Sequence, residues 1–236
     1  PATFPTARRG RHVEVEPEPE LACRLRVERR AFDFPDGARD PRVSLTAKAM
    51  CFLAGDRVHC HVSGTSTGFC QDGMNNMRNA WDQPSTVDGE FVRAYVEEHH
   101  GLPVNVSGHS QGAYDASRVA PELGAGDQLV LLQPPSAALV PNEALLSAID
   151  RGVRVFVAWS PNDDASLGIR LLAGSIPLLQ LPRQEGIRVH SAPNARHLFL
   201  QRFAVPAGRT INPALDASIL SNPDSPRGEW AFPEWA

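Results

Sequence analysis

The sequence predicts an α/β fold with a central, mostly parallel sheet, and three observations lead to that prediction. Strand-like and helix-like runs alternate along most of the chain, which is typical of parallel strands joined by helices. The chain has 236 residues, enough for one buried core. Its 42% apolar and 21% charged residues are ordinary for a globular protein. The ligand site of such a sheet lies at the carboxyl ends of its strands.

The first half of the chain is expected to contain three strands and two helices. Residues 23–32, 57–63 and 104–107 are interpreted as strands because apolar and β-branched side chains alternate or cluster there. Residues 45–53 form an apolar run that we interpret as a short helix. Residues 90–99 predict an amphipathic helix, since their apolar side chains recur at helical spacing.

The second half continues the alternation. The continuous apolar run at residues 129–132 is typical of a parallel strand that is covered on both faces. A final helix is expected to begin near His197, after the last strand. The remaining helices are predicted at residues 113–119 and 142–149, and the remaining strands at residues 153–159 and 187–190.

The pattern that indicates chemistry is a serine between a predicted strand and a predicted helix. The pentapeptide is Gly108-His109-Ser110-Gln111-Gly112. A serine on such a sharp turn is strained and presents its Oγ at the edge of the sheet, and the flanking glycines are needed because a Cβ would not fit. Ser110 is therefore the predicted nucleophile.

A serine nucleophile needs a base, and that base needs an orienting carboxylate. Asp163 and Asp164 follow the predicted strand at 153–159, and His197 follows the predicted strand at 187–190. The candidate acids and the candidate base therefore lie at the carboxyl ends of strands, at the same sheet edge as Ser110. We favour Asp163 as the acid because it is nearer the strand end, although spacing does not separate it from Asp164. We favour His197 as the base over His190, which is expected to lie inside the strand.

The tetrahedral oxyanion of acyl transfer needs two backbone N–H donors. One is the N–H of Gln111, at the start of the helix after the serine, where the helix dipole favours negative charge. The other is expected in the small polar turn at residues 63–68, after an earlier strand. We choose Thr65, whose hydroxyl is a further donor; the alternative is that this turn has no role in catalysis.

These residues carry a family resemblance. The pentapeptide resembles the elbow of α/β-hydrolases in general, and the Gly64-Thr65 step with the compact Ser-Asp-His spacing is similar to class 3 lipases. The resemblance covers about residues 45–205. It implies an oxyanion donor at Thr65 and a lid formed by residues 69–81. The lipase elbow usually has Leu and a second Gly where this chain has Gln111 and Ala113.

We therefore expect a serine hydrolase that cleaves carboxylic esters through an acyl-enzyme, without a large cap domain. By resemblance the substrates are small-molecule or lipid esters, including phospholipids. Thioester cleavage and acyl transfer use the same machinery and stay open. A rival from another class is a non-catalytic interaction module on a hydrolase scaffold. This mechanism requires no cofactor and no metal, and none is expected. His59 and His61 lie on the same face of a predicted strand but lack a third metal ligand nearby.

Charge and composition limit the other functions. The formal net charge of −4 argues against nucleic acid as a partner. No apolar run is long enough to span a membrane, while contact with a membrane surface stays open. The oligomeric state is not determined.

The chain organisation is expected to comprise three parts. Residues 1–20 form a Pro/Arg/Glu-rich N-terminal extension, residues 21–205 the hydrolase domain, and residues 206–236 a Pro-rich C-terminal extension packed on it. The four cysteines fit either disulfides of an exported protein or buried thiols, so secretion or delivery outside the cell stays open.

Overall fold

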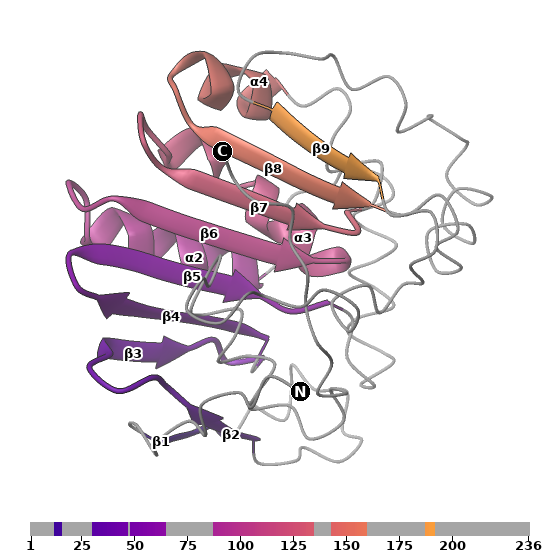
Figure 1. Cartoon of the computed structure of the whole chain (residues 1–236). Helices are drawn as coiled ribbons and strands as arrows, with labels where there is room; N and C mark the ends of the chain where they lie inside the picture. Colours follow the sequence, from indigo (N-terminus) through magenta and orange to yellow (C-terminus); the bar gives the residue numbers. More distant parts are fainter. Residues whose placement is uncertain are drawn as a thin grey trace, which may run out of the picture.

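The fold is an α/β structure built on one large sheet (Figure 1). The computed structural model describes residues 12–15, 30–46, 48–64, 87–134, 143–159 and 187–191, and the side chains within 34–46, 48–64, 87–134 and 143–157. A seven-stranded sheet has the order β3-β4-β5-β6-β7-β8-β9, and β1 and β2 pair separately. The predicted α/β class with a mostly parallel central sheet is confirmed, and the described residues form no cap domain.

The sheet is antiparallel at one edge and parallel over the rest. Strands β3, β4 and β5 pair antiparallel, and every pair from β5 to β9 is parallel. The strands are β1 His12–Val15, β2 Arg30–Asp33, β3 Arg39–Val43, β4 Ala49–Ala54, β5 Arg57–Val62, β6 Val104–His109, β7 Gln128–Leu132, β8 Arg154–Trp159 and β9 Ile187–Ser191. The helices are α2 Val87–Glu98, α3 Gln111–Ser117, the 3-10 turn η1 Ala120–Glu122 and α4 Glu143–Asp150.

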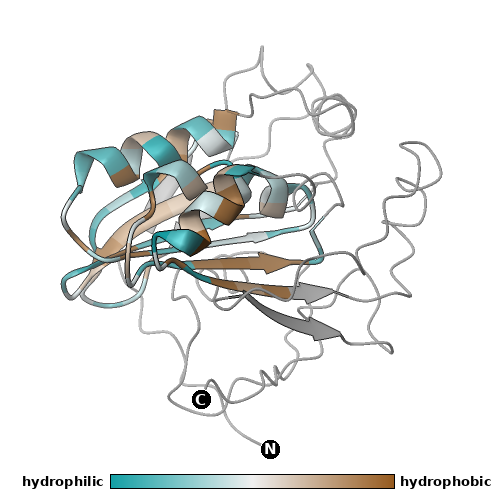
Figure 2. Cartoon of the chain, turned by 90° about the horizontal axis from the view of Figure 1, so that it is seen from above, coloured by the Kyte–Doolittle hydropathy of each residue, from teal (hydrophilic) through white to brown (hydrophobic). Residues whose placement is uncertain are grey.

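The described helices lie on one face of the sheet (Figure 2). The parallel strands follow one another in chain order without a reversal, and right-handed crossovers then bring each connecting helix to the same side. The apolar side chains of α2, α3 and α4 share one core cluster with alternate residues of β4 to β8. Hydrophobic burial against these helices therefore fixes which face of each strand points inward.

The predicted helix at residues 45–53 is wrong. Strand β4, Ala49–Ala54, occupies most of that run and pairs antiparallel with β5. Its first five residues are all buried, because both faces of β4 are covered. Residues covered on both faces give a continuous apolar run without period-2 alternation, so periodicity does not distinguish such a strand from a buried helix. The preceding strand β3 was not predicted.

A disulfide joins the two central strands of the antiparallel edge. Cys51 of β4 and Cys60 of β5 are opposite each other in the register, with their Cα atoms 4.2 Å apart. Both are fully buried in the helix-side core. Of the two alternatives for these cysteines, the disulfide holds for this pair, whereas Cys23 and Cys70 lie outside the described residues.

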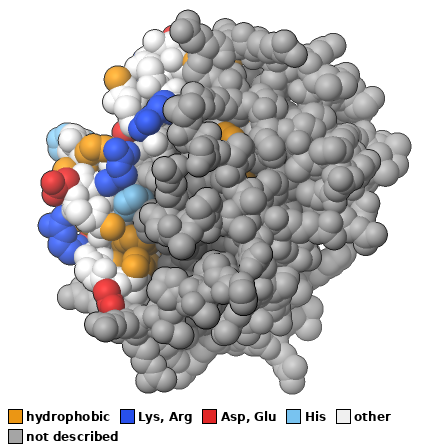
Figure 3. Space-filling view, in the orientation of Figure 1, with side chains coloured by type: hydrophobic (Ala, Val, Ile, Leu, Met, Phe, Trp, Pro, Cys, Tyr) orange, Lys and Arg blue, Asp and Glu red, His pale blue; other side chains and the backbone are white. Residues whose placement is uncertain are grey.

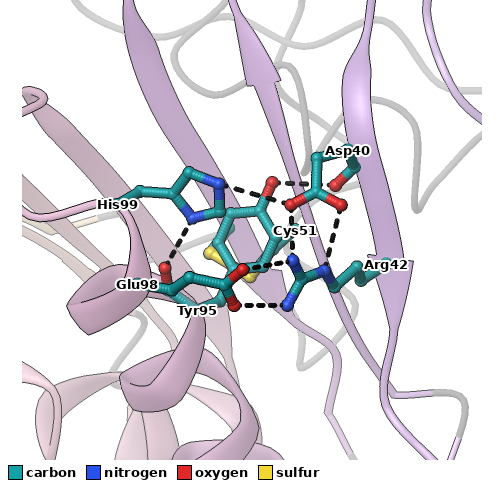
Figure 4. A network of polar contacts seen from close by, with 7 residues as sticks. Asp40, Arg42, Cys51, Tyr95, Glu98 and His99 are labelled. Carbon is teal, nitrogen blue, oxygen red and sulfur yellow. Dashed lines mark hydrogen bonds and ion pairs between the residues drawn. A yellow bond between two sulfur atoms is a disulfide. The ribbon is translucent and has the colours of Figure 1, made fainter.

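A polar network fastens strand β3 to the end of helix α2 (Figure 4). Arg42 forms bidentate contacts with two carboxylates, Glu98 at 2.6 and 2.7 Å and Asp40 at 2.7 and 3.0 Å. The Tyr95 hydroxyl donates to the Asp40 carbonyl at 2.8 Å, and His99 lies 3.3 Å from the Asp40 carboxylate. Bidentate pairs fix geometry as well as charge. This network therefore holds the antiparallel edge against the helix layer.

The opposite face of the sheet carries a buried polar strip at its centre. Val58, Cys60 and Val62 of β5 point to the helices, so His59 and His61 point the other way. The same alternation places the polar residues of β6 on that face. All members of the strip are at most 8% exposed; they are His59, His61, Asn105, Ser107 and His109. His61 Nδ1 lies 2.9 Å from Ser107 Oγ, the neighbour given by the strand register.

This strip makes stability depend on pH. Burial lowers the pKa of His61 from 6.5 to about 3, with a further contribution from His109, and lowers that of His59 to about 4. The unfolded chain therefore binds more protons below pH 6.5, so stability is full above that value and is lost as pH falls toward the folded-state pKa values. His61 alone should cost about 2 kcal/mol between about pH 7 and pH 5.

Urea unfolding at those two pH values tests this expectation. His61→Gln keeps a neutral polar side chain, so the variant should lose about 2 kcal/mol less than the wild type on acidification. Carboxylates titrate mostly below this window, which leaves histidines as the groups that change. An unchanged difference between the two pH values in His61→Gln would show that His61 is not held neutral by burial.

Candidate active site

Ser110 lies on a tight turn between strand β6 and helix α3. Its backbone has φ 56° and ψ −123°, a region that a residue with a Cβ rarely adopts. The turn is held from both sides, because the Ser110 N–H donates to the Leu132 carbonyl at 2.8 Å and Ala113 donates to the Ser110 carbonyl at 3.0 Å. The Ser110 side chain does not cap α3. The strained strand-turn-helix geometry predicted for Ser110 is therefore present.

The two glycines of the pentapeptide allow this turn to close. A Cβ at Gly108 would lie 2.2 Å from the Gly112 carbonyl oxygen, so the two arms of the turn are in contact. A Cβ at Gly112 would lie 2.2 Å from the Val62 carbonyl oxygen and 2.4 Å from that of Ser63. These are backbone atoms with little freedom to move. The steric argument made from the sequence is confirmed at both positions.

The loop after β5 lies directly beside the nucleophile. A Cβ at Gly64 would lie 3.0 Å from the Ser110 Cβ and 3.0 Å from the His109 Nδ1 atom. The predicted oxyanion donor Thr65 is the next residue but lies outside the described residues. Gln111, the other predicted donor, is the first residue of α3 and is 3% exposed. The structure thus brings Ser110, Gln111 and the start of the predicted oxyanion loop together.

The remaining triad candidates follow strands β8 and β9. Both strands run parallel to β6, and Trp159 is opposite Ser191 in their register, so their carboxyl ends lie at the same edge as Ser110. Asp163, Asp164 and His197 themselves lie outside the described residues and stay predictions. The predicted last helix from His197 and the predicted lid at residues 69–81 lie outside them as well.

The expectation for His190 is confirmed, since it lies within β9. The other predicted strands correspond to β5 to β9, and the predicted helices at 90–99, 113–119 and 142–149 correspond to α2, α3 and α4, with ends shifted by up to three residues. The predicted strand at 23–32 is described only from Arg30, where β2 begins.

Two residues near the elbow were not identified from the sequence. Lys48, just before β4, is 5% exposed, and its Nζ donates to the Gln111 Oε1 at 3.0 Å. Gln133 follows β7 with φ 46° and is 3% exposed. Strand register aligns His109 with Leu132, which puts Gln133 beside the nucleophile. A polar residue directly after a parallel strand was the available signal for Gln133.

A surface cleft of about 730 Å³ lies at the opposite edge of the sheet. It is lined by residues at the amino ends of β5, β6 and β8, among them Arg57, Val104 and Arg154. Basic side chains are visible on the left of Figure 3, over these strand ends. Five to six strand residues at about 3.3 Å each separate this edge from the elbow. The cleft is therefore not part of the Ser110 site.

The described residues contain no group of three or more His, Cys, Asp or Glu side chains placed to hold a metal ion. His61 instead pairs with Ser107. Among the helices that the structure describes, none has the length and apolar character needed to cross a membrane.

Comparisons with known proteins give structural likenesses at low identity. No family model and no curated protein matches the sequence. An alpha-beta serine hydrolase homologue from Coxiella burnetii is similar at 12% identity and TM-score 0.38, over 83% of this chain and 91% of that one. TT1662 from Thermus thermophilus has 18% identity and TM-score 0.28 over 57% of this chain, which spans only 59% of that protein. A lipase from Rhizopus microsporus var. chinensis has 12% identity and TM-score 0.30, over 53% of each chain.

The class of the protein follows from its own geometry. The sheet, the helix layer and the strained serine turn between β6 and α3 define an α/β-hydrolase scaffold.

Proposed function

We propose that this protein is a serine hydrolase that cleaves carboxylic esters through an acyl-enzyme. The observation that carries the proposal is the backbone of Ser110, at φ 56° and ψ −123° between a parallel strand and a helix. Strain of this kind persists only where the surroundings enforce it, and it gathers at functional sites. Here the enforcement comes from glycines that permit contact between α3 and the end of β5.

In the proposed reaction, the Ser110 Oγ attacks the acyl carbonyl carbon while His197 accepts its proton and Asp163 orients the imidazole. The carbonyl oxygen becomes an oxyanion that accepts hydrogen bonds from the backbone N–H groups of Gln111 and Thr65. The intermediate collapses, and the alcohol leaves with the proton from His197. Water then attacks the acyl-enzyme by the same route and releases the acid.

We propose lipid or phospholipid esters as the substrate class, which the resemblance to class 3 lipases supports. The side chain of Gln111 is a polar group where that family usually has leucine, and it is buried at the elbow. The Cys51–Cys60 disulfide favours a site of action in an oxidising compartment, where such bonds persist.

A fluorophosphonate probe tests the proposal. The probe phosphonylates activated serines, so the full chain should gain one adduct, and peptide mapping by mass spectrometry should place it on Ser110. Denatured protein is the control, because its serines lack the folded environment. A well-folded chain that stays unlabelled, or is labelled at another residue, would support the rival of a non-catalytic module or another nucleophile. A panel of esters that varies acyl length and head group then tests the lipid assignment.

A further inference from the structure

Lys48 is the single lysine of the sequence, although Lys and Arg together number 23. All the other residues in that count are arginines. The arginines that the structure describes make surface or part-buried contacts, such as those of Arg42 with Glu98. Lys48 is 5% exposed instead. An ammonium is compact and fits against one amide oxygen, whereas a guanidinium is a larger planar fork. The buried position of Lys48 therefore suits a compact ammonium group better than a guanidinium.

That position lies next to the nucleophile. The Lys48 Nζ donates to the Gln111 Oε1 at 3.0 Å, and Gln111 directly follows Ser110. The Nε2 atom of Gln111 is buried and has no hydrogen-bond partner among the described residues. An ammonium donates hydrogen bonds and accepts none, so Lys48 orients the Gln111 amide with its oxygen toward the Nζ atom. The cation therefore holds the side chain of the residue whose backbone N–H is the proposed oxyanion donor.

The backbone of Lys48 is bonded to the residue that follows strand β5. Ser63 donates to the Lys48 carbonyl at 2.9 Å, one residue before Gly64 in the loop beside the nucleophile. On the other side, the Lys48 N–H donates to Ser44 Oγ at 3.3 Å, and Ser44 donates to the buried carboxylate of Asp88 at 2.6 Å. Lys48 is thus fixed to helix α2 through its N–H.

We infer that Lys48 is a positioning residue that holds Gln111, whose backbone N–H is a proposed oxyanion donor, in place beside Ser110. This inference rests on the proposed function. Its side chain is bonded to the first residue of α3 and its carbonyl to Ser63 at the end of β5, so Lys48 links these two elements beside Ser110. Displacing donors from a developing charge lowers the rate of the chemical step more than it weakens substrate binding. Lys48 is therefore expected to control kcat, with little effect on KM.

The test uses a set of variants of the full chain. Lys48→Met removes the ammonium and keeps the chain length, Gln111→Leu removes the amide, and the double variant removes both. Arg39→Met is the matched control for lost charge, because Arg39 lies on the same sheet and contacts Gly55 at the far edge. For each, kcat and KM on a p-nitrophenyl ester, the rate of fluorophosphonate labelling and the thermal midpoint are measured.

We expect Lys48→Met to lower kcat by about 10- to 100-fold while KM changes by less than about threefold. Lys48→Met also leaves a buried oxygen unpaired and lowers the midpoint, whereas the double variant leaves no half-pair and regains stability. Its kcat should stay as low as that of Lys48→Met, and Arg39→Met should match the wild type. If Lys48→Met fails to fold, the double variant gives the comparison.

Wild-type kcat in Lys48→Met, or its recovery together with stability in the double variant, would make Lys48 purely structural and overturn the inference. If either result is found while the wild type reacts with the fluorophosphonate and hydrolyses the ester, the proposed function still stands. A folded wild type that does neither would overturn the proposed function and this inference together.

Discussion

Replacing Ser110 with alanine should lower the hydrolysis of an activated ester by at least about 10³-fold. The reason is that no other group supplies the attacking oxygen, while the oxyanion donors alone retain a small part of the rate enhancement. The fold should survive, because alanine keeps the Cβ and the Ser110 side chain caps no helix. Initial rates on p-nitrophenyl esters, at matched protein concentration, give the measurement.

Ser147→Ala is the control for this variant. Ser147 lies on the exposed side of α4, where its hydroxyl accepts a hydrogen bond from Arg151 at 2.7 Å. Its rate should equal that of the wild type, which separates loss of the nucleophile from loss of any serine hydroxyl. Hydrolysis that persists in folded Ser110→Ala would mean that the reaction uses another nucleophile, and the elbow would lose its assigned role.

The parallel half of the fold could be predicted because its strands have recognisable sequence patterns. Strand β7 is a short apolar run between turns, and β6 leads directly into Ser110 of the Gly-x-Ser-x-Gly pentapeptide. Strands β3 and β4 of the antiparallel edge lacked a signal that identifies a strand. Strand β4 has both faces covered, so its sequence resembles a buried helix, and β3 contains Arg39, Asp40 and Arg42, whose polar contacts replace apolar alternation. Tertiary contacts decided those two elements.

In the candidate site, the residues that belong to a sequence motif could be predicted, whereas those outside any motif could not. Ser110 and the glycines around it are recognisable because a strained turn restricts which residues fit. Lys48 is far from Ser110 in the sequence, and the pairing of β4 with β5 and of β5 with β6 brings its side chain to Gln111. Its status as the single lysine was a signal in the sequence, but composition does not say which partner a lone cation meets.

The second large effect is expected for Gly112→Ala. The added methyl group would lie 2.2 Å from the Val62 oxygen and 2.4 Å from the Ser63 oxygen, both in the backbone. Relief requires helix α3 to move away from the end of β5, which also moves Ser110 away from Gly64. Overpacking of this kind should destabilise the protein by about 3 kcal/mol or more. That is a large fraction of the roughly 5–15 kcal/mol that stabilises a typical domain.

A series of glycine-to-alanine variants makes this expectation quantitative. At Gly124 the nearest atom to an added Cβ is 4.0 Å away, so Gly124→Ala should unfold in urea much like the wild type. At Gly64 the nearest atoms are at 3.0 Å and include the Ser110 Cβ, so Gly64→Ala should lower activity more than stability. Gly112→Ala should be the least stable of the three. Equal unfolding midpoints for Gly112→Ala and Gly124→Ala would show that α3 does not pack against the β5 backbone as closely as these contacts require, because a methyl group at 2.2 Å from a carbonyl oxygen has no other way to be accommodated.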